Sequence, residues 1–282
     1  MSYKVSHTLP YRIELYRQLK RKRTLFAYLF VTALPVIVAA AVKFGPTGHA
    51  GGATKFGSGS ADLIGLATKG AANFTFTMFY FATPFLLVAV ISLFNGDTIA
   101  SEASWSSLRY LLTAPIPRIR LAIQKLKVSL TLSLVAIIWL PVISWLVGFL
   151  AFGTTPFQSP LGISLSNSTS LQRITLTTAY LLFEFLFVAA LAFWIGVRTD
   201  SPLGAVGVAV GIIILLNILD AINSLGNIRN FLPVHYFFSW FDALGAQISW
   251  GNMFRGAGYS IIWFVILLCA AIRKFQNKDI YS

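Results

Sequence analysis

Residues 128–152, VSLTLSLVAIIWLPVISWLVGFLAF, decide the fold class, because this long run contains no charged side chain. A helix needs roughly 20 residues to cross a hydrocarbon core about 30 Å thick. Five other windows are similarly apolar: 24–42, 73–94, 174–197, 202–219 and 256–272. These runs are continuously apolar and do not alternate, so they predict helices rather than the strands of a membrane barrel. We therefore expect an all-α polytopic membrane protein with six transmembrane helices.

Composition and charge agree with a membrane protein. The chain is 56% apolar and 11% charged, whereas charged residues make up about 25% of typical soluble domains. If both termini are cytoplasmic, sixteen of the 22 Lys and Arg residues lie on the cytoplasmic side. This distribution follows the positive-inside rule, so the net charge of +13 reflects orientation in a lipid bilayer and does not indicate a nucleic-acid partner. We expect a multi-pass protein of the cell membrane with both termini in the cytoplasm.

Residues 1–23 precede the first apolar window and predict an amphipathic interfacial helix. Basic residues fill most of its circumference, and one arc of the helical wheel is apolar, comprising Leu9, Ile13, Leu15, Tyr16 and Leu19. Such a helix suits the surface of an anionic leaflet. The alternative is that this segment acts only as a positively charged orientation signal. We treat residues 1–23 as one unit and residues 24–282 as the six-span transmembrane domain.

Residues 221–252 are too polar and interrupted to span a membrane, yet too aromatic for a solvated loop. We expect a re-entrant or interfacial pair of short helices with rings at headgroup depth. Phe231, Tyr236 and Phe237 from this segment are candidates for an external gate. Glu184, in the middle of the fourth window, is a candidate for substrate passage or proton handling. The alternative is a protonated or hydrogen-bonded Glu184 that ties its helix to a neighbour.

The fifth window carries Gly204, Gly207 and Gly211 at helical spacing. Glycines on one face allow helices to approach closely. This face could contact a second copy of the chain or allow helices to shift, and ordinary contact within one chain is the simpler alternative.

Residues 95–127, NGDTIASEASWSSLRYLLTAPIPRIRLAIQKLK, form a basic segment between the second and third windows. Helical spacing is plausible over 97–113, and Pro115 and Pro117 force a turn within 114–117. The helix should resume near Arg118 and bring Lys125 and Lys127 to the membrane edge, where long basic side chains can reach the interface. The segment therefore predicts a helical hairpin on the cytoplasmic face.

The residues that carry a family resemblance are Gly96, Glu102, Leu111 with Leu112, Pro115 with Ile116, Arg118 and Lys125. Their order resembles the cytoplasmic loop of type-2 ATP-binding-cassette (ABC) exporter permeases. The six-span plan, the basic first segment, the aromatic stretch before the last window and the short basic tail also fit that family. Pro117 departs from the usual turn and could stiffen it.

The resemblance implies a permease that pairs with a second copy or a homologous permease and binds two cytoplasmic ABC ATPase subunits. ATP and Mg would be bound by the ATPase partners. Segment 95–127 would be a coupling hairpin that docks on them through Glu102, Leu108, Arg109, Leu111, Leu112, Pro115, Ile116 and Arg118. Glu102 would contact the ATPase or the surface helix; the alternative is that it holds its own helix or pairs with a nearby Arg.

No catalytic machinery is visible in the sequence. It has no G-x-x-x-x-G-K-[ST] phosphate loop, and its three His residues are scattered. We expect no enzyme activity, cofactor or metal in this chain, and export of a hydrophobic or amphiphilic cargo such as a lipid, drug or antibiotic-like peptide. The alternatives are an ATPase-coupled scaffold or sensor subunit and an ion-driven secondary transporter, which would usually show more polar residues in its spans.

Overall fold

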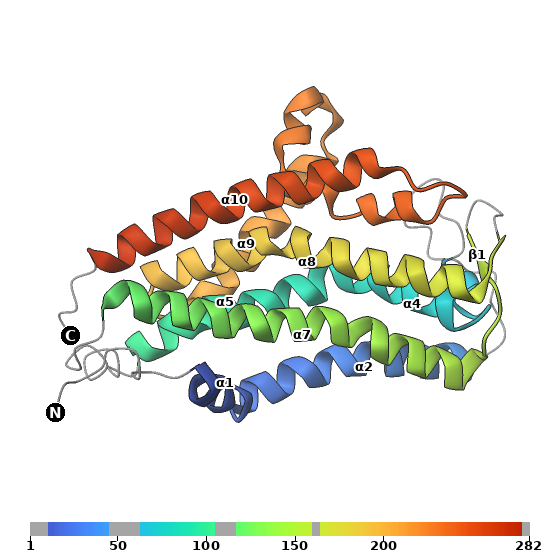
Figure 1. Ribbon diagram of the computed structural model, residues 1–282, viewed down its shortest axis with the longest axis horizontal. Coiled ribbons are helices and arrows are strands. Elements are labelled where there is room, and N and C mark those ends of the chain that lie inside the picture. The colour runs from blue at the N-terminus through green and yellow to red at the C-terminus, as the bar shows by residue number, and fades with distance from the viewer. Residues whose placement is uncertain (1–10, 45–62, 105–116, 160–163, 278–282) are drawn as a thin grey trace.

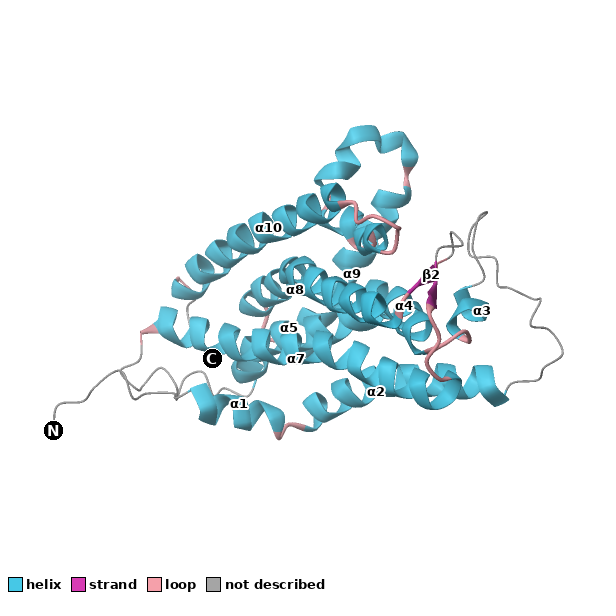
Figure 2. Ribbon diagram, turned by 45° about the vertical axis from the view of Figure 1, so that its right-hand side comes forward, coloured by secondary structure: helices cyan, strands magenta, loops and turns pink. Residues whose placement is uncertain are grey.

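The computed structural model describes residues 11–44, 63–104, 117–159 and 164–277, and it is mostly helical (Figures 1 and 2). Strands in these residues are limited to β1 (Phe157–Gln158) and β2 (Ser164–Leu165), which pair antiparallel at one end of the bundle. A five-residue helix, α3, spans Leu63–Ala67.

Six helical stretches of the described residues are long and apolar enough to cross a membrane, as the sequence predicts. Five of them are single helices: α2 (Lys22–Phe44), α7 (Arg118–Phe152), α8 (Asn167–Arg198), α9 (Pro202–Ala221) and α10 (Trp250–Gln276). The remaining span joins α4 (Ala71–Phe81), η3 (Ala82–Leu87) and α5 (Val88–Ser104). Its middle part is a π-helix that contains Pro84, which has no N–H for the regular ladder.

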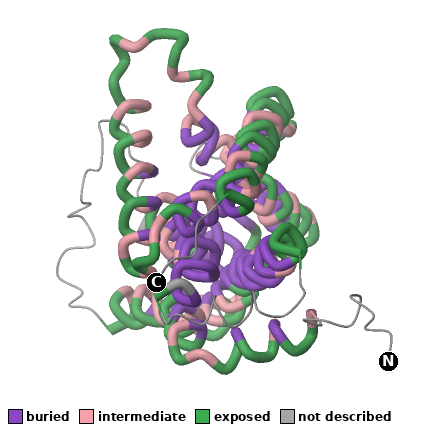
Figure 3. Tube along the Cα trace, turned by 90° about the vertical axis from the view of Figure 1, so that its left-hand side faces the viewer, coloured by how far each residue is buried: buried purple, intermediate pink, exposed green. Residues whose placement is uncertain are grey.

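Helix α8 lies in the interior of the bundle and packs mainly on α5 and α10. In its apolar window 78% of the residues are buried, against 17% in α9 and 22% in both α2 and α10. Buried positions gather in the middle of the bundle in Figure 3, and the outer helices are largely exposed. The exposed positions include large apolar side chains such as Leu203, Phe30 and Phe254. An apolar outer surface around a packed interior is compatible with a multi-pass membrane protein.

Helices α5 and α8 cross with their backbones in contact. A Cβ placed on Gly196 would lie 2.2 Å from the carbonyl oxygen of Gly96, so no side chain fits at this position. Small residues at a crossing allow this approach between helices in a membrane. By contrast, Gly207 and Gly211 of α9 face open space, so contact within the described part of the chain does not explain them.

The second span is longer than the sequence suggests. We expected it to end near residue 94 and to be followed by a separate polar segment, but α5 continues to Ser104 and buries Asn95, Asp97 and Glu102. Asn95 donates to Ser133 Oγ at 2.9 Å and accepts from Ser129 Oγ at 2.8 Å, both on α7. Polar partners on neighbouring helices allow these residues to be buried, because buried polar groups require hydrogen bonds.

Residues 221–252 contain three 3-10 helices, η4 (Asn223–Phe231), η5 (Pro233–Tyr236) and η6 (Ser239–Ala243), rather than the expected pair. The chain after α9 (orange in Figure 1) projects from the side of the bundle and then returns to it. Asp220 at the end of α9 holds this return, since its Oδ1 lies 2.6 Å from His235 Nδ1 and 3.5 Å from Arg229 Nε.

Helix α1 (Tyr11–Leu19) lies at the same end of the bundle as the C-terminal end of α10 (Figure 1). Its polar residues Glu14 and Gln18 are buried against the protein, whereas Ile13, Tyr16 and Leu19 are exposed. In a soluble protein the apolar face of such a helix would be buried and the polar face exposed. Here the apolar face is exposed and available to lipid.

Candidate functional site

Seven charged side chains from α1, the turn after it, the start of α2, α5 and α7 meet at one end of the bundle. We call them the charge network; its members are Glu14, Arg17, Arg21, Arg23, Asp97, Glu102 and Lys125. The three carboxylates and Lys125 are buried, and the arginines reach them from partly exposed positions. Charges that leave water are stable only when paired and hydrogen-bonded, and each buried charge here has an opposite partner.

Lys125 of α7 is the centre of the network. Its Nζ donates to Glu14 Oε1 at 2.7 Å and also to Glu102 Oε1. Arg17 of α1 pairs with the same two carboxylates, at 2.9 Å from Glu14 Oε2. The Lys125 side chain is only 1% exposed. The expectation that Lys125 extends to the membrane edge is therefore wrong, because two buried carboxylates offer its ammonium a better environment than the interface does.

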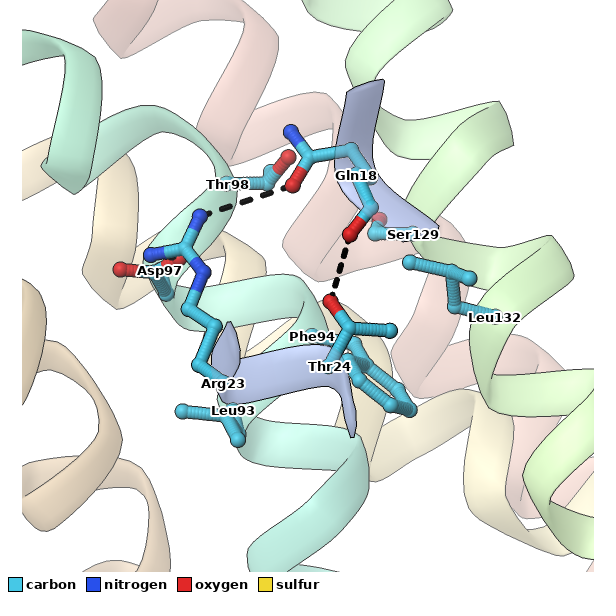
Figure 4. Close-up of a pocket in the computed structure, with 9 residues that line it drawn as sticks. All are labelled: Gln18, Arg23, Thr24, Leu93, Phe94, Asp97, Thr98, Ser129 and Leu132. Carbon is cyan, nitrogen blue, oxygen red and sulfur yellow. Dashed lines mark hydrogen bonds and ion pairs between the residues drawn. The ribbon is translucent and has the colours of Figure 1, made fainter. Parts of the chain in front are cut away.

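Asp97 anchors the second part of the network, one and a half turns before Glu102 on α5. It pairs with Arg23, and Arg21 Nη1 lies 4.0 Å away. Arg21 also donates to Ser101 Oγ at 3.3 Å. Beside Asp97 and Arg23 is a cavity of about 10 Å³ (Figure 4). Two hydrogen bonds connect residues that line this cavity: Arg23 Nη2 donates to Gln18 Oε1 at 3.5 Å, and Thr24 Oγ1 donates to the Gln18 carbonyl at 2.7 Å.

The electrostatics of the network favour the ionised forms of the groups on α1. Burial alone would raise the pKa of Glu14, but Lys125 and Arg17 outweigh it and lower this pKa to about 2. Burial likewise opposes the charge of Arg17, yet Glu14 and Glu102 raise its pKa above the usual value. Arg21 differs, because burial and the neighbouring Arg17 lower its pKa. Helix α1 is thus attached by charges that persist at neutral pH.

The network lies near the C-terminal end of α5 and the N-terminal part of α7, the two helices that flank residues 105–116 in the sequence. Glu102 is two residues before the end of α5, and Lys125 is about two turns into α7. The helix resumes at Arg118, as expected, and Arg118 Nη1 donates to the carbonyl of Gln276 on α10 at 2.8 Å. The other candidates for ATPase contact lie outside the described residues: Leu108, Arg109, Leu111, Leu112, Pro115 and Ile116. Glu102 pairs with Arg17 of α1. This pair is the expected contact with the surface helix, and it is also a pairing with an Arg.

A second polar cluster lies between α8, α10 and η5. Glu184 is fully buried, and its Oε2 is 3.1 Å from the Tyr180 hydroxyl, which also donates to the Tyr236 carbonyl at 2.6 Å. Gly256 of α10 makes this contact possible, since a Cβ there would lie 2.4 Å from the Tyr180 oxygen. The structure therefore brings Glu184 and Tyr236 together.

The gate candidates from the aromatic segment differ in environment. Phe237 is buried, with its ring 5.6 Å from that of Phe185. Phe231 is 63% exposed and reaches the second cluster only through Tyr259, whose ring lies 6.1 Å from Phe231 and 5.7 Å from Tyr236. Phe237 thus belongs to the core, and Phe231 lies at its edge.

Sequence reasoning missed several residues of these two clusters. Glu14 is the single acidic residue among the first 23, an isolated negative charge that signals a specific partner. Tyr180 precedes Glu184 by four residues, which places both on one face of a helix. Gly256 gives no comparable signal, because its role depends on side chains from α8 and η5.

Within the described residues, no three His, Cys, Asp or Glu side chains form a group that could hold a metal ion. No curated protein matches the sequence. Residues 53–281 match a family model described as "Protein of unknown function (DUF2705)". The matched range includes Asp97, Glu102 and Lys125 and begins after α1 and α2. Because this range covers most of the chain, the protein belongs to the DUF2705 family.

Proposed function

We propose that this chain is the membrane-spanning subunit of an ATP-driven exporter of the type-2 ABC class. It works with two cytoplasmic ATPase subunits and a second permease, identical or homologous. The cargo class is a hydrophobic or amphiphilic molecule, and the setting is the cell membrane with both termini in the cytoplasm. ATP and Mg are bound by the ATPase partners.

The observation that supports this proposal best is the charge network at the base of segment 105–116. Glu102 and Lys125 stand near the two ends of that segment and pair with each other, and Arg17 and Glu14 add α1 to the same unit. A force applied to 105–116 is transmitted through its covalent ends to α5 and α7, and the ion pairs extend it to α1. Coupling a motor to a pore requires such an element that moves as one body.

In this mechanism, nucleotide binding draws two ATPase subunits together and displaces the two coupling segments. The bundles then change access to a pathway between the permeases. Apolar surfaces that face lipid suit an amphiphilic cargo. Residues 221–252 act as a re-entrant external gate, in which Tyr236 and Phe237 lie against α8. Helix α1 rests on the inner leaflet through Ile13, Tyr16 and Leu19, which are exposed.

Co-purification tests the partnership. The tagged chain, with a photo-cross-linking residue in place of Leu111, is co-expressed with candidate ABC ATPase subunits that carry a phosphate loop. The proposal expects ATPase to co-purify and to cross-link at Leu111. The matched control places the same photo-cross-linker at Phe254 of α10, which is 69% exposed and lies on the external side in the proposed topology. Absence of ATPase from the purified complex would contradict the proposal.

An ion-driven secondary transporter is the second candidate, and the buried carboxyl of Glu184 favours it, since such residues mark ion and proton pathways. Transport of a fluorescent lipid into vesicles distinguishes the two. An exporter needs ATP and the ATPase subunits, whereas a secondary transporter responds to an imposed ion gradient without ATP. A scaffold or sensor subunit would bind the ATPase and transport under neither condition.

A further inference from the structure

Glu184 differs from every other buried carboxylate of the described residues in having no cationic partner. Glu14, Asp97 and Glu102 all form ion pairs. The Glu184 side chain is 0% exposed, its Oε2 contacts the Tyr180 hydroxyl, and its Oε1 has no hydrogen-bond partner. Ser260 of α10 lies beside this carboxyl, and its buried Oγ also lacks a partner of suitable geometry. A bare carboxylate in such a place would be very costly.

The contacts of Tyr180 give an independent indication of a proton. Its oxygen lies 2.6 Å from the Tyr236 carbonyl oxygen and 3.1 Å from Glu184 Oε2. A tyrosine hydroxyl carries one proton, and a carbonyl can only accept. One hydroxyl proton cannot point well at both oxygens, so two protons satisfy these two contacts better than one. Tyr180 supplies the one directed at the carbonyl, and a protonated Glu184 supplies the other.

We propose that Glu184 binds a proton at the junction of α8, α10 and η5, and that this proton lets Tyr180 fasten η5 to α8 through the Tyr236 carbonyl. Loss of the proton converts the carboxyl into a stronger acceptor than the carbonyl. The single Tyr180 proton then turns to Glu184, and the bond to η5 is lost. The site thus links protonation inside the bundle to attachment of the aromatic segment.

The charged and titratable groups around this site are few. Tyr180 is the one on α8. Element η5 contributes Tyr236 and His235, and His235 is bound to Asp220 of α9. Helix α10 contributes Tyr259, stacked on Tyr236, and Arg255, and η6 contributes Asp242, which accepts from Asn252 at 2.9 Å. Neither Arg255 nor any other cation of the described residues pairs with Glu184. The proton is therefore the group that neutralises it.

Infrared difference spectroscopy tests the proton directly on the purified full chain, without an ATPase. Subtracting the Glu184→Gln spectrum from that of the wild type should leave the carbonyl band of a protonated carboxylic acid, shifted in deuterated buffer. Carboxylate bands in its place at neutral pH would overturn the proposal. Because no ATPase or transport is involved, this result is independent of the exporter proposal.

Hydrogen exchange tests the link to η5. The exchange rate of amides in residues 233–243 is compared between wild type and Glu184→Gln at the same pH, from mildly acidic to alkaline, which cancels the intrinsic pH dependence. The exchange rate of the wild type divided by that of Glu184→Gln should be near one at mildly acidic pH. It should rise roughly three- to tenfold as the Glu184 carboxyl ionises, which is the range expected for one lost hydrogen bond. Tyr180→Phe should exchange fast at every pH and keep the carboxylic acid band. A ratio that stays at one while the wild-type band disappears would overturn the link.

Discussion

Two regions of this molecule bury glutamates in opposite ways. At the end that carries α1, Glu14 and Glu102 share Lys125 and Arg17, so their negative charges are balanced by cations. Between α8, α10 and η5, Glu184 has only hydroxyl groups beside it. The first arrangement is ionic and joins three helices, and the second is uncharged and depends on a proton.

This difference separates a permanent connection from a conditional one. Ion pairs between groups that stay charged at neutral pH hold α1, α5 and α7 together in the structure, and in the proposed exporter they would persist throughout the transport cycle. A carboxyl that depends on its proton can release its partner when solvent reaches it. In the proposed exporter, the charge network would therefore transmit force, and the Glu184 cluster would control release of residues 221–252.

The largest effect should follow removal of the central cation. Lys125→Ala leaves Glu14 and Glu102 buried without the cation that bonds to both of them. Removing one partner of a buried ion pair costs about 3–5 kcal/mol. We expect a loss of that size in unfolding free energy, or loss of folded protein, measured by denaturant titration in detergent. Lys127→Ala is the control, because Lys127 is exposed two residues further along α7.

Replacing the whole pair sharpens the same test. Glu102→Gln combined with Lys125→Met removes both buried charges, and well-packed substitutes for a buried pair are often neutral for stability. The double variant should recover part of the stability that Lys125→Ala loses. A double variant as unstable as the sum of its single changes would show that the two residues act independently.

Acidification should release α1 next. Because the pKa of Glu14 falls from 4.5 to about 2 on folding, its contribution is complete above pH 4.5 and is lost as the pH falls toward 2. The shift corresponds to roughly 3 kcal/mol of docking free energy. A fluorophore on Ile13→Cys, in a Cys269→Ala background, reports the environment of α1. With Glu14→Gln, docking should be weaker at neutral pH and much less sensitive to acid.

A smaller effect is expected where α10 approaches α8. Gly256→Ala places a Cβ 2.4 Å from the Tyr180 oxygen and 2.6 Å from Tyr236 Cβ. Overfilling a packed site costs about 1–3 kcal/mol. Gly258→Ala is a matched control, because no atom lies within 4 Å of its Cβ position. Thermal unfolding in detergent should separate the two variants, and equal melting temperatures would contradict close contact at Gly256.

The smallest effect concerns one hydrogen bond of α1. Tyr11 donates to Thr131 Oγ1 of α7 at 2.7 Å. Tyr11→Phe should weaken docking of α1 by about 1 kcal/mol, visible with the same fluorophore on Ile13→Cys. Tyr16→Phe serves as the control, since Tyr16 is exposed and its ring remains available to Lys20. If α1 docks equally well in both variants, the hydrogen bond from Tyr11 to Thr131 contributes little to the docking of α1.

The sequence predicts the six apolar helices because their signal is local: length and the absence of charge suffice. It also places the restart of α7 at Arg118, since prolines act on their neighbours. The length of α5 escapes such reasoning, because Asp97 and Glu102 find their partners on the start of α2, α1 and α7, far away in the sequence. The link from Tyr180 to the Tyr236 carbonyl is equally non-local, as is the burial of Lys125.

The measurement that tests the proposed function most directly is the number of cargo molecules moved per ATP hydrolysed, in vesicles that contain this chain and the proposed ATPase subunits. Glu102→Gln weakens the pairing with Lys125 and Arg17 that joins the coupling segment to the bundle. We predict that this variant still binds the ATPase and hydrolyses ATP, while the ratio falls several-fold. An unchanged ratio with the ATPase bound would contradict a role of the charge network in transmitting force.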